Sequence, residues 1–160
     1  MAISPNDNFT AGQVLTATEC NQFPRGVMAL ATSTTNYTLT TSTVIATGMT
    51  VTFTADLTRM YKITYYEPYV ETSTAGSGST TTLTIRPTNA AGTAIQSGFA
   101  ASVSVVKSID SIGLVGTVSG ITGSVTYVGC AVTSSATGTP LLQRTGTAVA
   151  YLLVEDIGIA

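Results

Sequence analysis

The stretch TVTFTADLTRMYKITYY, residues 50–66, decides the expected fold. Its first half alternates apolar and hydroxyl side chains, with Val51 and Phe53 standing between threonines. Because successive side chains of a β-strand point to opposite faces, this alternation predicts a strand with one buried face and one wet face. Residues 56–59 have the composition of a turn. A second alternating run starts at Tyr61, and its strand is expected to end at Pro68. The stretch therefore predicts two strands joined by a turn.

The same period of two recurs along the chain from residue 26 onward. Leu83 and Ile85 alternate with threonines, and apolar strands are expected over 124–132 and 147–157. Gly-, Ser- and Asn-rich turns separate these runs. Seven to nine short strands at this spacing predict one all-β domain over residues 26–160, either an antiparallel β-sandwich or a jelly-roll-like barrel.

Composition narrows the functional classes. The 160 residues are 44% apolar, enough for a core, while charged residues make up only 9%, against roughly 25% in ordinary soluble domains. The net charge is −2 and histidine is absent from the sequence. A helical bundle, a His-ligated zinc enzyme and a basic nucleic-acid binder are therefore excluded.

No motif in the sequence points to catalysis, a metal or a cofactor. Without histidine there is no Ser-His-Asp triad, and neither GxGxxG nor a P-loop is present. We therefore expect a non-enzymatic protein without cofactors. Cys20 and Cys130 are expected to be free thiols, with a single bridge as the alternative in an oxidising compartment. No run of 18 apolar residues occurs, so membrane insertion is not expected.

Residues 1–25 differ from the rest of the chain. Residues 16–19 (TATE) fit a capping box, which predicts one or two helical turns that Pro24 ends. A helix this short is marginal alone in water, so we expect the segment to be a docking arm that packs on its own domain or on another protein. Its expected docking residues are Val14, Leu15, Cys20 and Phe23.

The two late strands carry apolar residues on both faces. An antiparallel sheet packed on one side leaves its other side in water, so a doubly apolar strand predicts that a second subunit covers the outer face. The alternative is that the outward residues sit at strand ends. We place the subunit contact at Val149, Tyr151 and Leu153.

Four of the seven tyrosines fall within residues 61–69. Tyrosine offers rigid amphipathic area, so Tyr66, Glu67 and Tyr69 are a candidate surface for contact with a receptor or subunit. The alternative is that these aromatic side chains fill the core and the sheet edge.

Three segments carry a resemblance to a known group of proteins. Residues 9–27 (FTAGQVLTATECNQFPRGV) resemble the N-terminal segment of tailed-bacteriophage virion proteins, in which "GxVLTA…N…PRG" leads into a β-domain. Residues 151–158 (YLLVEDIG) are similar to their closing strand, and residues 50–66 to a strand pair between these ends.

The resemblance implies a structural role in the virion. It implies a surface-exposed β-domain of the tail or tail fibre, assembled as a homotrimer and anchored through residues 1–25 to another virion protein. A capsid decoration protein, or a tail-tip adhesin that binds a host surface glycan or protein, is the alternative. Expected partners are thus other copies of the chain and a second virion protein, with no nucleic acid.

Overall fold

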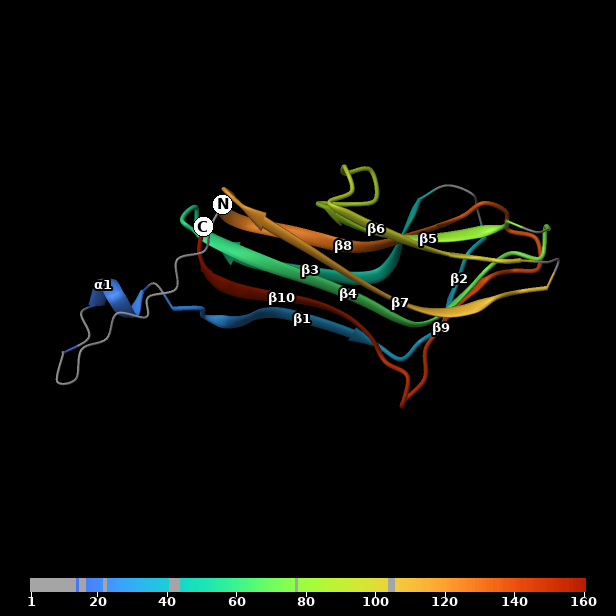
Figure 1. Ribbon diagram of the computed structural model, residues 1–160, viewed down its shortest axis with the longest axis horizontal. Coiled ribbons are helices and arrows are strands. Elements are labelled where there is room, and N and C mark those ends of the chain that lie inside the picture. The colour runs from blue at the N-terminus through green and yellow to red at the C-terminus, as the bar shows by residue number, and fades with distance from the viewer. Residues whose placement is uncertain (1–13, 15–16, 22, 41–43, 77, 104–105) are drawn as a thin grey trace.

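A computed structural model describes residues 14, 17–21, 23–40, 44–76, 78–103 and 106–160. After one helical turn the described chain is built from β-strands (Figure 1). The elements are α1 (Ala17–Cys20), β1 (Gly26–Ser33), β2 (Tyr37–Thr38), β3 (Ile45–Ala55), β4 (Arg59–Glu71), β5 (Thr80–Pro87), β6 (Gln96–Ala101), β7 (Ile109–Ser119), β8 (Gly123–Thr133), β9 (Leu141–Gln143) and β10 (Ala150–Ile159).

Within the described residues the strands form two antiparallel sheets that face each other. Sheet A has the order β1-β10-β4-β9-β2, and β7 pairs with the other side of β4. Sheet B has the order β3-β8-β5-β6. The two layers run side by side along the long axis, and α1 lies beyond one end of them (Figure 1). The expected all-β, sandwich-like fold is confirmed.

The core lies between the sheets and follows the alternation in the sequence. On β3 the side chains of Met49, Val51, Phe53 and Ala55 are buried, whereas the intervening threonines are exposed. The large buried side chains that meet in this core are Met49, Phe53, Tyr61, Ile63, Tyr65, Leu83, Ile85, Leu142, Leu152 and Val154. Burial of such side chains, each contributing about 1.5–3 kcal/mol, holds the two layers together.

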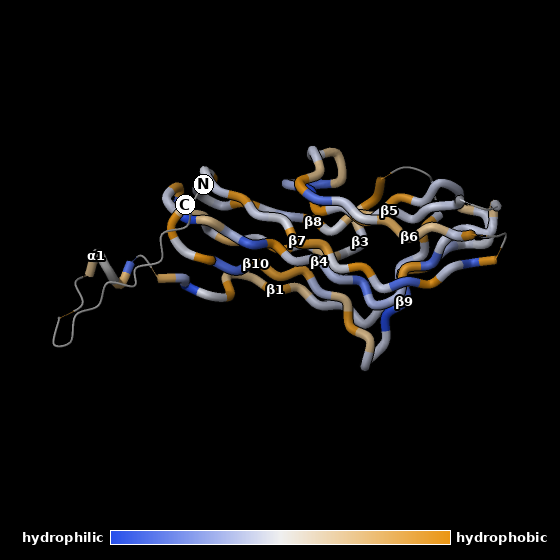
Figure 2. Tube along the Cα trace, in the orientation of Figure 1, coloured by the Kyte–Doolittle hydropathy of each residue, from blue (hydrophilic) through white to orange (hydrophobic). Residues whose placement is uncertain are grey.

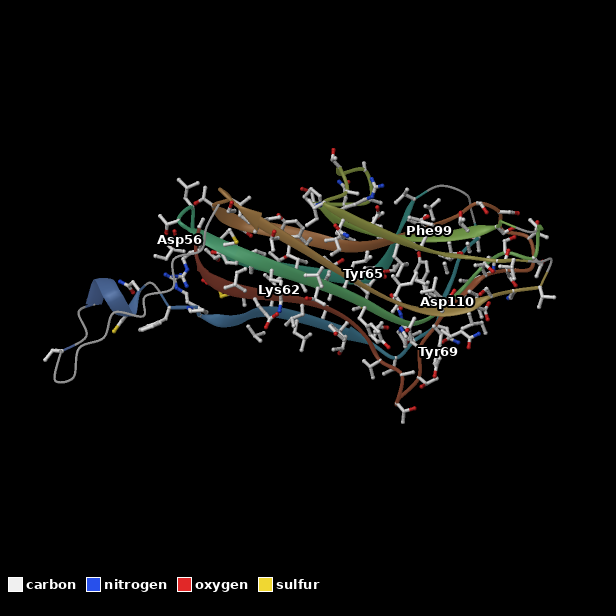
Figure 3. The ribbon with its side chains drawn as sticks, viewed as in Figure 1. Asp56, Lys62, Tyr65, Tyr69, Phe99 and Asp110 are labelled. Carbon is white, nitrogen blue, oxygen red and sulfur yellow. The ribbon has the colours of Figure 1, made fainter. Side chains whose placement is uncertain are left out.

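Tyr65 and Gly129 show how closely the sheets approach. Tyr65 on β4 is fully buried and lies inside the sandwich (Figure 3). A Cβ atom added to Gly129 on β8 would come within 2.7 Å of its ring. Only glycine leaves room for the aromatic ring at this position.

Two details differ from the sequence prediction. The strand expected to end at Pro68 continues to Glu71, because the register of β4 against β7 shifts between Glu67 and Val70. Such a bulge accommodates a proline, which has no N–H to donate to the ladder. The described residues form ten strands, because two very short strands, β2 and β9, pair with each other in addition to those expected. Strands of two or three residues are too short to show an alternating pattern in the sequence.

Candidate functional site

The outward face of sheet A carries a row of mostly apolar side chains across four neighbouring strands, with a threonine on one of them. Leu30 on β1 lies opposite Leu153 on β10, Leu153 opposite Thr64 on β4, and Thr64 opposite Val115 on β7. Leu30 is 58% exposed and Val115 is 54% exposed. Apolar colouring recurs along β1 and β10 (Figure 2). The row leaves a largely apolar strip, in which Leu30 and Val115 are exposed and Leu153 is half-buried.

A second row lies one pleat further along the strands. Tyr151 on β10 is opposite Thr32 on one side and Tyr66 on the other. The two tyrosine rings stack, with centroids 5.4 Å apart and planes inclined by 30°. We call these two rows the outer A face; its residues are Leu30, Thr32, Thr64, Tyr66, Val115, Tyr151 and Leu153.

The charges next to the outer A face cancel. Lys62 and Glu155 lie opposite each other in the row beyond Leu153 and form an ion pair of 2.5 Å between Nζ and a carboxylate oxygen. Figure 3 shows Lys62 midway along the sheet. The face therefore presents apolar and hydroxyl groups with no net charge from this pair.

The outward face of sheet B is different in chemistry. Its β3 side carries exposed Thr50, Thr52 and Thr54, and the hydroxyls of Thr52 and Thr126 lie 2.8 Å apart. For Val128 and Cys130, the expectation that strand 124–132 needs a second subunit to cover it is wrong. These two outward residues are at most 4% exposed within this single chain, whereas the third, Val132, is half-buried in a row with Thr82 and the exposed Phe99.

The cover over β8 comes from the chain itself. Arg86 lies opposite Val128 and donates hydrogen bonds to the carbonyl oxygens of Ala90 and Gly92 in the loop after β5. Burial raises the pKa of the Cys130 thiol, although the nearby Arg86 charge acts in the opposite direction. The chain itself therefore covers Val128 and Cys130, whereas Val132 on β8 and the outward residues Tyr151 and Leu153 on β10 are only half-buried.

The two surfaces predicted from sequence meet at one end of the outer A face. A shallow depression of about 480 Å³ lies there, and its lining residues are Tyr66, Pro68, Tyr69, Ser111, Thr147, Ala148 and Val149. Tyr69 is 45% exposed and lies at the end of the sandwich away from α1 (Figure 3). The tyrosine surface and the residues assigned to the subunit contact thus form one continuous surface.

Glu67 is not part of that surface, and its assignment to a contact site is wrong. Its side chain is fully buried and receives hydrogen bonds from Arg144 Nε (3.0 Å) and from the Tyr65 hydroxyl (2.6 Å). Arg144 also donates to the carbonyl oxygen of Thr47 at 3.2 Å. We call Arg144, Glu67, Tyr65 and Thr47 the buried Arg144 network. Burial and the Glu67 charge raise the pKa of Tyr65 well above its ordinary value.

The described residues of the arm project from the sandwich. Val14 is 84% exposed, Phe23 is 38% exposed, and Cys20 at the end of α1 is also exposed. Leu15, the fourth expected docking residue, lies outside the described residues. Neither Val14 nor Cys20 is buried against the chain's own sheets, which leaves both available to another surface.

A buried ion pair joins the arm to the sandwich. Arg59, at the start of β4, is 1% exposed and binds both carboxylate oxygens of Asp156 on β10, at 2.8 and 2.7 Å. The same guanidinium donates to the carbonyl oxygens of Asn21 and Phe23. Arg25 lies 4.0 Å from Asp156 and 3.7 Å from Asp56, which lies at this end of the sandwich (Figure 3).

Sequence reasoning did not single out this junction as a site. A signal was present in the sequence. The three segments that carry the resemblance each contribute one residue to this junction, namely Arg25, Arg59 and Asp156. Burial works against ionisation of Asp156. Hydrogen bonds from Arg59 and from the Gly158 amide outweigh burial, and they hold the pKa of Asp156 below its ordinary value of 3.8.

Comparison with models of protein families and with curated proteins finds no match for this chain. In the described part of the chain, no helix has the length and apolar character needed to cross a membrane. The described residues also hold no cluster of three or more Cys, Asp or Glu side chains suited to a metal ion.

Proposed function

We propose that this chain is a non-enzymatic structural protein of a bacteriophage virion. It forms a surface-exposed β-domain of the tail or tail fibre, assembles as a homo-oligomer, and is anchored to the particle by residues 1–25. The observation that carries the proposal is the outer A face, a largely apolar strip across four strands whose Leu30 and Val115 are exposed to water in the single chain. The phage setting rests on the resemblance of the three sequence segments described above.

Self-association follows from the chemistry of the outer A face. Apolar area removed from water contributes about 25 cal/mol per Å², so Leu30, Leu153 and Val115 favour contact with another apolar surface. A closed ring of identical subunits buries such a strip without forming open filaments. The proposal that the chain self-associates rests on this face, whereas the expectation of three subunits rests on the resemblance to phage virion proteins.

Sedimentation of the full chain tests the association. We expect the wild type to run as a species about three times the 16.3 kDa monomer mass, and Leu153→Lys to run as a monomer. The matched control is Thr52→Lys, which places the same charge on the exposed face of sheet B. A wild type that is monomeric at micromolar concentration contradicts the proposal. An oligomer that Leu153→Lys leaves intact contradicts the choice of face.

The anchoring role of the arm has its own test. Deletion of residues 1–24 should leave a folded β-domain that no longer joins the particle. Incorporation of the deletion variant at normal copy number would overturn the anchoring. Cryo-electron microscopy of the intact particle would separate a tail location from the alternative of capsid decoration.

The depression beside Tyr66 and Tyr69 favours a second candidate, an adhesin module of the tail tip. Half-exposed aromatic rings next to the hydroxyls of Ser111 and Thr147 suit a sugar ring, whose apolar face stacks while its hydroxyls bond. Tyr69→Ala should then abolish binding to an oligosaccharide panel, while Phe99→Ala, which removes another exposed aromatic ring, should not. Absence of binding by the wild type rules this candidate out.

A further inference from the structure

We propose that Arg59 and Asp156 form a clamp that fixes the direction in which the arm leaves the sandwich. They are positioning residues for docking, and this role rests on the proposed function of the arm. We call Arg59, Asp156 and the carbonyl groups of Asn21 and Phe23 the junction clamp.

The hydrogen bonds of Arg59 are shared between the sandwich and the arm. Nε and Nη2 grip the two carboxylate oxygens of Asp156, which fixes the plane of the guanidinium. Nη1 then reaches the carbonyl oxygen of Asn21 at 2.5 Å, and Nη2 that of Phe23 at 2.6 Å. A guanidinium is a planar fork, so its orientation dictates where these two carbonyls lie.

Asp156 is itself held rigidly. It pairs with Gly26 on β1 and with Tyr61 on β4, so its strand is bonded on both sides. The Gly158 amide donates to its Oδ1 at 2.9 Å, across the point where the register of β10 shifts. The clamp is thus fixed to the interior of sheet A and grips the backbone just before β1 begins.

The burial of the pair makes the grip strong. Arg59 and Asp156 are each 1% exposed, so their mutual attraction is little screened by water or salt. An arm held in one direction has already lost conformational entropy before it docks. Such preorganisation increases the affinity of the arm for its partner without any new contact. The apolar residues of the arm would then meet their partner in a defined orientation.

Nitroxide labels measure the direction of the arm directly in the full chain. Cys20 is exposed and Cys130 is buried, so a label added to the native protein goes to Cys20. A second label at Thr54→Cys, exposed on β3, reports the distance from the arm to the sandwich. We expect a narrow distance distribution in the protein with Arg59 intact. A broad distribution there overturns the clamp.

Arg59→Lys keeps the positive charge but lacks the planar fork. We expect it to widen the distribution by on the order of 5–10 Å, as for a short flexible segment, without loss of β-sheet circular dichroism. The control Lys62→Gln, which removes a charge from the same strand at a half-exposed ion pair, should leave the width unchanged. A folded Arg59→Lys protein with the unchanged narrow distribution overturns the proposal.

A further variant covers the case in which Arg59→Lys does not fold. Arg59→Met with Asp156→Leu replaces the buried pair by apolar groups, a change that often preserves stability. A wide distribution in this folded variant supports the clamp, and a narrow one overturns it. The measurement needs no particle. If the clamp holds but deletion of residues 1–24 leaves incorporation unchanged, the clamp is supported and the proposed docking fails.

Discussion

Replacement of Glu67 by glutamine should destabilise the fold severely. The change keeps the shape of the side chain but removes the charge that faces Arg144, which is itself only 4% exposed. One carboxylate oxygen also becomes an amide donor and faces the guanidinium donors. Loss of one partner of a buried pair costs about 3–5 kcal/mol. A typical domain has about 5–15 kcal/mol in total, so Glu67→Gln should remove a large part of the free energy of unfolding.

Urea unfolding followed by far-UV circular dichroism and tyrosine fluorescence measures this loss. The matched control is Glu155→Gln, the same chemical change at the outward ion pair with Lys62, where we expect at most about 1 kcal/mol. A second variant, Glu67→Leu with Arg144→Leu, should recover most of the stability because no charge is left unpaired. If Glu67→Gln and Glu155→Gln cost the same, the reasoning about the buried Arg144 network is refuted.

Three further outcomes are expected. The pKa of the Asp156 carboxyl is lowered in the folded protein, so its contribution to stability is complete above pH 3.8 and is lost as the pH falls through the pKa of the folded state. The difference in the free energy of unfolding between the wild type and Asp156→Asn should therefore shrink below pH 3.8. A difference that stays constant with pH contradicts this. Gly129→Ala should cost about 1–3 kcal/mol in urea unfolding because of the ring over it, whereas Gly113→Ala, with its nearest neighbour at 3.9 Å, should be tolerated. With a thiol reagent, Cys20 should react rapidly in the native protein and Cys130 only after unfolding; two rapid thiols would show that Cys130 is accessible.

The period of two in the sequence was sufficient to predict the layers of the fold. On β3 and on the first half of β4 it assigned each side chain to the correct face, because both strands border one core and one wet surface. On β10 it placed Tyr151 and Leu153 on the outward face, and the burial pattern agrees, because both are half-buried while Leu152 between them is buried.

The prediction failed where a contact joins residues distant in sequence. By the alternation along β4, Glu67 faces inward like Tyr65. A carboxylate is nevertheless predicted to be exposed to solvent unless the sequence reveals a positively charged partner for it. That partner, Arg144, lies 77 residues away. Val128 is likewise covered by Arg86, which lies opposite it on β5, and by the loop that follows β5. The hydrophobic pattern of the β8 sequence alone does not predict this contact. Arg59 and Asp156, 97 residues apart, were overlooked for the same reason.

The place of β10 in sheet A has a consequence for how the chain folds during synthesis. β10 follows the other described strands in sequence, yet it lies between β1 and β4. β1 therefore has no neighbour in its sheet until residues 150–159 have left the ribosome. Pairings between such distant segments form slowly, typically in milliseconds to seconds. Until then, β1 and its leucine Leu30 remain without a paired strand in sheet A of the nascent chain.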